Sequence, residues 1–286
     1  MNIRQILRNA LWKQPATPAA RADPPAEIPV HRGLVQGQTA VVVGAGPNTG
    51  QGIASVLGSE GARLLVTNAS GADLGQVLDS LREAGLDAAK LEGDITSSRD
   101  TAALLAMLDR LGWTPDILVL NVGVHSREGA ESLGESERVF RTNVAGPLWL
   151  ARQVAERMRT RSTPGAIIFI SSIHQQLWRG DASYSGSKAA LTMAMRELAL
   201  ELVPAGIRIN GVAPGWVAAD ADGRPVPHRL TPLYQTSTPP AAIGQAVVFL
   251  ASRVMSGHMT GAVLTVDGGA TLASYATPPL PALPAE

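Results

Sequence analysis

The stretch VGAGPNTGQGIA, residues 43–54, follows a short and mostly apolar run, TAVVV, at residues 39–43. Its glycines lack the spacing G-x-G-x-x-G, but Gly44, Asn48 and Gly50 match G-x-x-x-G-x-G with one glycine replaced. Asn is the residue other than glycine that best tolerates a positive φ, so Asn48 leaves a tight turn possible. A turn between a strand and a helix exposes backbone N–H groups that bind phosphate. The stretch therefore predicts either a phosphate-binding turn or only a tight connection.

Composition limits the classes of function. The 286 residues are 45% hydrophobic, enough for one large α/β domain or two small ones. The 24 basic and 24 acidic residues cancel, so we expect no nucleic-acid partner. Cysteine is absent, which excludes disulfides, thiolate catalysis and cysteine zinc sites, and we expect no metal site. Neither a membrane span nor a signal-peptide pattern occurs, so we expect a cytoplasmic protein.

The chain divides into three parts. Residues 1–37 form an N-terminal extension, with a short amphipathic helix at 3–13 and a linker rich in Pro and Ala. We interpret the helix as docked on the body or on a neighbouring subunit, with a membrane-surface anchor as the alternative. Residues 38–270 form the main domain, and residues 271–286 form a Pro-rich tail, whose stretch TPPLPALPAE at 277–286 cannot continue a helix.

Within the main domain, apolar strands alternate with helical patterns. The predicted strands are 39–43, 63–67, 87–91, 116–120, 166–170, 207–212 and 262–266. Several are continuous runs of Val, Ile and Leu, as is typical of parallel strands covered on both faces. The alternation predicts a single α/β domain with a doubly wound, Rossmann-like parallel sheet and a ligand crevice at the carboxyl ends of its strands. The residues expected to meet there are Gly44, Asn121, Ser171, Ser172, Pro214 and Gly215.

Tyr184 and Lys188 lie four residues apart at the start of a predicted helix, and so on one face of it. A phenol with a pKa of about 10 can serve as an acid or base at neutral pH if a nearby ammonium lowers that pKa. The chain holds only three Tyr and three Lys against 21 Arg, so a chance Y-x-x-x-K is roughly a 3% event. The pair predicts a proton-transfer site.

These motifs occur in an order that resembles the short-chain dehydrogenase/reductase family over about residues 36–270. The resemblance rests on the Gly44 turn, Asp94-Ile95, Asn121-Val122-Gly123, Asn143, Ser171-Ser172, Tyr184-x-x-x-Lys188, Pro214-Gly215 and Val266-Asp267-Gly268-Gly269. The chain departs from the family pattern at Val43, Asn48, Leu120 and Val122. The resemblance implies an NAD(P)-dependent oxidoreductase that transfers a hydride between a nicotinamide and a small-molecule carbonyl or secondary alcohol.

The resemblance implies four catalytic residues. Tyr184 would be the acid/base, Lys188 would lower its pKa and bind the nicotinamide ribose, and Asn143 would support a water relay. A serine would hold the substrate oxygen. The spacing to Tyr184 selects Ser171, whereas the strand-end pattern selects Ser172. We prefer Ser172, because a deletion in a loop is tolerated better than a change of strand register.

The resemblance also implies which residues bind the cofactor. They are Gly44, Asn48, Thr49, Gly50, Asn68, Ser70, Asp94, Ile95, Asn121, Gly123, Tyr184, Lys188, Pro214, Gly215 and Val217. An acid at position 68 would bind the ribose of NAD and repel the 2′-phosphate of NADP, but Asn68 carries no charge. Ser70 offers a phosphate donor, while Pro47 stands where many relatives that prefer NADP have a basic residue. We expect a slight preference for NADP over NAD.

The substrate is not identified by the sequence. The predicted walls of its pocket are His125, His174, Gln175, Trp178, Trp216 and the loop 217–231. The alternative function is a non-catalytic, nucleotide-binding regulatory or interaction protein of the same fold. Such a protein would be expected to lack one or more of the Ser, Tyr, Lys and Asn residues of the catalytic set, and all four are present here.

The predicted helices 142–158 and 184–202 are apolar around much of their circumference. A helix that flanks a sheet needs only one apolar stripe, so a second apolar face indicates another partner. We therefore expect a homodimer or homotetramer. The alternative is a monomer in which the helix at 3–13 covers that face.

Overall fold

A computed structural model of the protein describes residues 33–127, 132–160, 164–221, 223–228 and 230–276. The predicted helix at 3–13 and the tail beyond residue 276 lie outside these residues. The first residues of the predicted tail continue the fold, since they belong to the helix α10 (Ala270–Ala276). No helix in the described part of the chain is long and apolar enough to cross a membrane.

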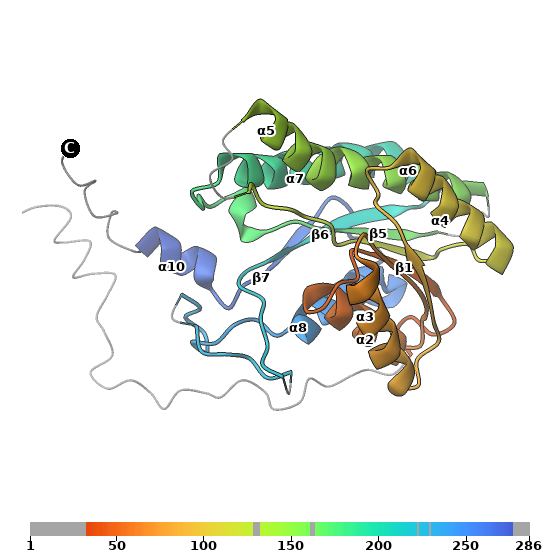
Figure 1. Cartoon of the computed structure of the whole chain (residues 1–286), viewed down its shortest axis with the longest axis horizontal. Coiled ribbons are helices and arrows are strands. Elements are labelled where there is room, and N and C mark those ends of the chain that lie inside the picture. The colour runs from red at the N-terminus through yellow and green to blue at the C-terminus, as the bar shows by residue number, and fades with distance from the viewer. Residues whose placement is uncertain (1–32, 128–131, 161–163, 222, 229, 277–286) are drawn as a thin grey trace, which may run out of the picture.

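Seven parallel strands form one sheet in the order β3-β2-β1-β4-β5-β6-β7 (Figure 1). The strands are β1 (Thr39–Val43), β2 (Arg63–Asn68), β3 (Ala88–Glu92), β4 (Ile117–Leu120), β5 (Ala166–Ile170), β6 (Arg208–Pro214) and β7 (Val263–Val266). Every predicted strand is present, with ends that shift by at most two residues. The predicted doubly wound, single-domain fold is therefore confirmed.

Helices cover both faces of the sheet, with α4, α5, α6 and α7 on one side and α2, α3 and α8 on the other (Figure 1). The helices are α2 (Thr49–Ser59), α3 (Gly71–Glu83), α4 (Ser98–Leu111), α5 (Leu133–Phe140), α6 (Gly146–Thr160), α7 (Ala182–Leu202), α8 (Pro240–Ala251), α9 (Arg253–Ser256) and α10. Short turns are η1 (Arg141–Ala145), η2 (Ile173–Gln175) and η3 (Val203–Ala205). One apolar core lies between the sheet and each helical layer.

The strand order reverses between β2-β1 and β4-β5, because the chain crosses from one half of the sheet to the other. In open parallel sheets a ligand crevice forms at such a point, outside the carboxyl ends of the strands. The continuous Val, Ile and Leu runs explain why β1, β4 and β5 are buried along their whole length. Polar residues begin directly after these strands, so the crevice gathers them at one edge.

Candidate active site

The turn after β1 depends on two residues with positive φ. Gly44 has φ 78°, and a Cβ atom there would lie 2.1 Å from the Asn121 carbonyl oxygen. Asn121 Nδ2 in turn donates to the Gly44 carbonyl at 2.8 Å. The positive φ expected at Asn48 is confirmed at 79°, and its Nδ2 donates to the Val217 carbonyl at 3.1 Å. A Cβ atom at Gly50 would lie 2.3 Å from the Gly44 carbonyl oxygen, so the turn and α2 are in direct backbone contact.

The N-terminus of α2 differs from those of the next three helices. It begins at Thr49 with no side-chain cap and no acidic residue in its first turn. By contrast, α3, α4 and α5 begin after Ser70, Ser97 and Ser132, whose hydroxyls accept a backbone N–H, and each has an acid in its first turn. The first turn of α2 therefore keeps N–H groups and positive helix-dipole charge available for an anion.

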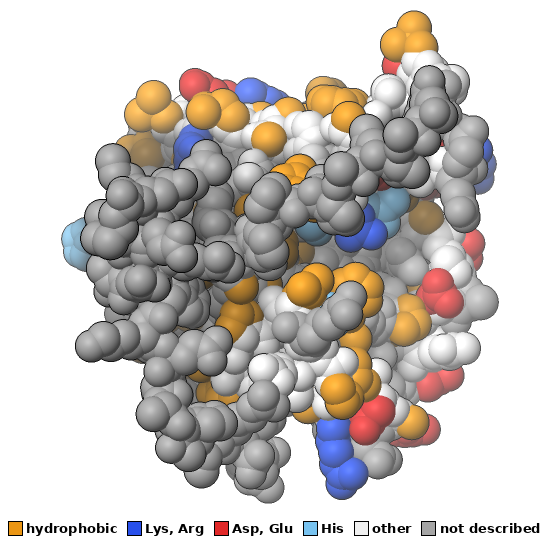
Figure 2. All heavy atoms as spheres, turned by 90° about the vertical axis from the view of Figure 1, so that its left-hand side faces the viewer, with side chains coloured by type: hydrophobic (Ala, Val, Ile, Leu, Met, Phe, Trp, Pro, Cys, Tyr) orange, Lys and Arg blue, Asp and Glu red, His pale blue; other side chains and the backbone are white. Residues whose placement is uncertain are grey.

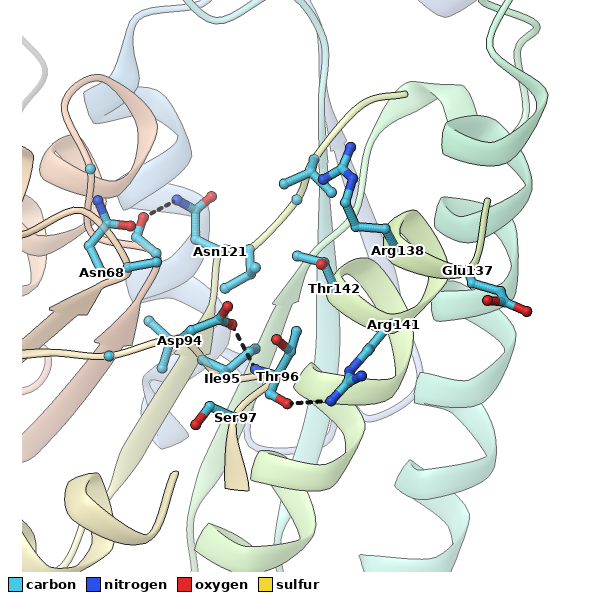
Figure 3. Close-up of a pocket in the computed structure, with 18 of the residues that line it drawn as sticks. Asn68, Asp94, Ile95, Thr96, Ser97, Asn121, Glu137, Arg138, Arg141 and Thr142 are labelled. Atoms are coloured by element: carbon cyan, nitrogen blue, oxygen red, sulfur yellow. Dashed lines mark hydrogen bonds between the residues drawn. The ribbon is translucent and has the colours of Figure 1, made fainter. Parts of the chain in front are cut away.

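A cavity of about 1090 Å³ opens beside this turn (Figure 3). The predicted cofactor residues that line it are Gly44, Asn68, Asp94, Ile95, Asn121 and Gly123. They come from the carboxyl ends of β1 to β4, and Figure 3 shows Asn68, Asp94 and Asn121 around the same space. Ser70 is not among the lining residues, because its hydroxyl caps α3 by accepting from the Asp73 N–H.

A second cavity, of about 760 Å³, adjoins the first, since Asn121, Val122 and Gly123 line both. Four further predicted cofactor residues line it, namely Thr49, Pro214, Gly215 and Val217. Ser172, Tyr184 and Lys188 line it too, as do the predicted wall residues His125, His174, Trp178 and Trp216. The two cavities therefore form one elongated space along the edge of the sheet.

Lys188 is buried at 3% exposure at the floor of the second cavity. Its Nζ atom donates to the carbonyl oxygens of Ile170 at 3.1 Å and Val122 at 3.3 Å, and lies 5.8 Å from the centre of the Tyr184 ring. Burial lowers the pKa of Lys188 to about 8. A methyl group on Gly123 would lie 2.9 Å from Nζ, so the glycine leaves room for the lysine head group.

Tyr184 is also buried, and its pKa differs from the sequence prediction. Burial raises the pKa of Tyr184 above the ordinary phenol value, and the Ser172 hydroxyl and the Arg179 charge offset this only in part. The prediction that Lys188 lowers the Tyr184 pKa is therefore not met in this structure. The ammonium group donates to two backbone carbonyls, and Lys188 is not among the groups that shift the Tyr184 pKa.

The two candidate serines have different surroundings. The Ser171 hydroxyl lies within hydrogen-bond distance of Gln175 Oε1, at 3.0 Å, and of Thr192 Oγ1, at 3.1 Å, under the first turns of α7. Ser172 accepts from a backbone N–H in η2, and its hydroxyl is close enough to Tyr184 to lower the pKa of the phenol. The geometry favours Ser172. Gln175, predicted as a pocket wall, is not among the lining residues, because its amide oxygen accepts from Ser171 and Thr192.

Asn143 lies in η1, a single π-helical turn between α5 and α6, and is fully buried. Its Oδ1 accepts from the Val124 N–H at 2.7 Å, and its Nδ2 donates to the Val124 carbonyl and the Ser187 hydroxyl, each at 2.9 Å. Turns of this kind are frequent at functional sites. The side chain therefore ties the loop after β4 to α7, one residue before Lys188.

Sequence reasoning missed two charged residues beside Tyr184. Asp181 caps α7: its carboxylate accepts from the Tyr184 N–H at 2.9 Å and from the N–H and hydroxyl of Ser126. An Asp directly before a helix is a readable cap signal. Arg179 has its guanidinium carbon 5.7 Å from the centre of the Tyr184 ring, and no local pattern marks it. The His125 ring lies 4.0 Å from that of Tyr184, on the cavity wall where it was expected.

Comparison with known proteins gives consistent matches. The family profile described as enoyl-(acyl carrier protein) reductase matches residues 44–271. A 3β-hydroxysteroid dehydrogenase of Eggerthella lenta is 32% identical, over 83% of this chain and 95% of its own length. Glucose 1-dehydrogenase 2 of Bacillus subtilis is also 32% identical, over 82% of this chain and 95% of its own.

The fold is shared with solved structures as well. A 7α-hydroxysteroid dehydrogenase complexed with NADH and 7-oxo glycochenodeoxycholic acid superposes with a TM-score of 0.73 at 29% identity, over 82% of this chain and 94% of the other. This structural similarity agrees with the family profile, which covers most of the sheet. It also agrees with the two dehydrogenases, which match over nearly their whole length. Together with the seven-stranded sheet and the ordered motifs at its carboxyl edge, these matches show that the chain belongs to the short-chain dehydrogenase/reductase family.

Proposed function

We propose that the protein is an NAD(P)-dependent oxidoreductase that transfers a hydride between a nicotinamide and a carbonyl or secondary alcohol. The observation that carries this proposal is the meeting of Tyr184, Ser172 and Lys188 in a cavity continuous with the one beside the Gly44 turn. Relatives named as steroid and glucose dehydrogenases, and one solved with NADH, support the same class of reaction.

The cofactor side fits a dinucleotide on three grounds. A Cβ atom at Gly44 or Gly50 would collide with backbone, so both positions need glycine for a close turn. The first turn of α2 has no cap and no acid, which suits a pyrophosphate. The two adjoining cavities together are lined by residues from Asn68, in the first, to Tyr184, in the second. When bound, the nicotinamide supplies or accepts the hydride.

We infer that any preference for NADP over NAD is small. Asn68 lacks the charge that would repel a 2′-phosphate, as the sequence suggested. Glu92, however, pairs with Asn68 across β2 and β3, and its Oε2 atom would lie 2.2 Å from a Cβ atom at Gly71. This carboxylate therefore lies against Gly71, the residue after Ser70, where its negative charge opposes binding of the 2′-phosphate of NADP.

The residues around Tyr184 have different roles in the proposed proton transfer. Because burial raises the pKa of Tyr184, the phenol stays protonated at neutral pH and can donate its proton to a carbonyl oxygen. The Ser172 hydroxyl beside it would hold that oxygen by a second hydrogen bond. Lys188 supplies positive charge at the cavity floor, and Asn143 keeps the Val124 backbone and α7 in register.

The test combines binding and turnover. Equilibrium titration with NADPH and NADH should show saturable binding, and absorbance assays with ketones, quinones and sugars should find a reducible compound. Tyr184→Phe keeps the ring but removes the proton, so turnover should fall by about 10²–10⁴ with cofactor affinity nearly unchanged. Tyr234→Phe, outside both cavities, is the matched control.

Two outcomes would contradict the proposal. If neither dinucleotide binds, the oxidoreductase function is wrong. If Tyr184→Phe retains native turnover on the compound found, the proposed acid/base is wrong. Binding of a dinucleotide without turnover of any compound would favour the non-catalytic alternative.

We also propose that the protein is a homodimer or homotetramer. Large apolar side chains remain exposed on α6 and α7, with Trp149 at 52%, Met193 at 55% and Leu200 at 73% exposure. Light scattering at micromolar concentration should give a multiple of the 29.8 kDa chain mass. A monomer would refute the proposal, and an oligomer that persists without residues 1–30 would show that the extension does not hold it together.

A further inference from the structure

Positive and polar side chains surround Tyr184 in the second cavity. Its ionisable lining residues, besides Tyr184 itself, are His125, His174, Arg179, Lys188 and His228, and no Asp or Glu lines it in the described part of the chain. Figure 2 views the side of the molecule where α10 follows β7, which is the carboxyl edge of the sheet, and shows His and basic side chains near the middle of that face. The cavity that would hold the substrate therefore has an excess of positive charge.

Among these residues, Arg179 carries an exposed positive charge. The Lys188 ammonium is buried and donates to two backbone carbonyls. His125 and His174 are neutral at pH 7, because partial burial and the Arg179 charge lower the pKa of both imidazoles. Arg179 is exposed to the cavity mouth, and within the described residues it forms no ion pair with a carboxylate.

Asp181, the acid closest to Arg179 in the chain, does not neutralise it. The Asp181 carboxylate accepts three hydrogen bonds, from the Tyr184 N–H and from the N–H and hydroxyl of Ser126, and does not line the cavity. It also occupies the N-terminus of α7, the other place nearby where an anion would bind. The Arg179 guanidinium is therefore available to an anionic ligand beside Tyr184.

We propose that the substrate is an oxo- or hydroxy-carboxylic acid and that Arg179 binds its carboxylate while Tyr184 faces its carbonyl or hydroxyl group. A single guanidinium matches one carboxylate through two parallel hydrogen bonds. The apolar side chains of Ile173, Leu177 and Trp178 line the same cavity and suit the hydrocarbon part of such a molecule. This inference rests on the proposed function, because it describes the substrate of that site.

The test uses 4-oxocyclohexanecarboxylate and its neutral ethyl ester, which carry the same ketone. Binding is measured by tryptophan fluorescence with oxidised cofactor present, since Trp178 and Trp216 line the cavity. We expect the acid to bind about tenfold more tightly than the ester, and less so as salt is raised. This preference should disappear in Arg179→Gln, remain in part in Arg179→Lys, and persist fully in Arg110→Gln, which removes an exposed arginine on α4.

The outcomes separate this inference from the proposed function. Equal binding of acid and ester to the native protein, or no binding of either, would overturn the role of Arg179, as would an undiminished preference in Arg179→Gln. None of these results affects the binding of NADPH or the reduction of neutral ketones, which test the function itself. Faster NADPH-dependent reduction of the acid than of the ester, lost in Arg179→Gln, would support both.

Discussion

The two adjoining cavities differ in the kind of contact that shapes them. Backbone forms the cofactor side, where the Gly44 turn, the start of α2 and the strand ends approach one another closely. Side chains form the substrate side, where His125, from the loop after β4, meets Arg179 and Tyr184. The cofactor side should therefore fail when a single methyl group is added, whereas the substrate side should respond to changes of charge and protonation.

The largest effect is expected for Gly44→Ala. The new Cβ atom would lie 2.1 Å from the Asn121 carbonyl oxygen, at a φ that side chains rarely adopt. We expect the free energy of unfolding to fall by about 4 kcal/mol and NADPH binding to be lost. Urea denaturation and cofactor titration measure both.

Gly46→Ala is the matched control for stability. Its φ is not positive, and the nearest atom to its Cβ would be Asn68 Nδ2 at 3.4 Å, so we expect a change of less than about 1 kcal/mol. Similar losses of stability in the two variants would show that the turn does not depend on a close backbone approach. The difference drawn between the two cavities, one shaped by close backbone contacts and the other by side chains, would then be wrong.

The same contrast explains what the sequence could predict. The strands and the Gly44 turn leave local marks, namely apolar runs and residues that permit a positive φ, and both were found. The direction in which a side chain points has no such local sequence pattern. Gln175 turns inward because Ser171 and Thr192 offer partners, and Arg179 reaches Tyr184 because the η2 loop folds over α7. The Gln175–Thr192 contact spans 17 residues, and the other contacts depend on how the segment between β5 and α7 folds.

Protonation was the least predictable property. Spacing places Tyr184 and Lys188 on one face of α7, as expected, but the shifts of both pKa values come mainly from burial. Because both side chains are buried, burial raises the pKa of the phenol and lowers that of the ammonium. A sequence pattern carries no information about this loss of hydration.

The next effect concerns Lys188, which lines the second cavity. Its pKa is lowered from 10.5 to about 8, so between these values the unfolded chain binds more protons than the folded protein. The stability of the native protein should therefore rise with pH from about 8 to 10.5, by about 3 kcal/mol relative to Lys188→Met. Urea denaturation of both proteins at several pH values measures the difference. Parallel pH profiles would show that the buried ammonium is not destabilising.

The smallest effect, and the one that most sharpens the comparison, concerns Glu92, an exposed side chain at the end of β3 next to Gly93, which lines the cofactor cavity. Glu92 lies beside Gly71, near the expected position of a 2′-phosphate, so its charge should favour NADH over NADPH. Glu92→Gln should raise the ratio of kcat/KM for NADPH to that for NADH by about threefold, and less at high salt, because the carboxylate is exposed. Glu83→Gln, an exposed acid at the end of α3, should leave the ratio unchanged. If Glu92→Gln leaves the ratio unchanged or lowers it, then Asn68 and its neighbours set cofactor choice without this carboxylate, and the charge of Glu92 has no part in it.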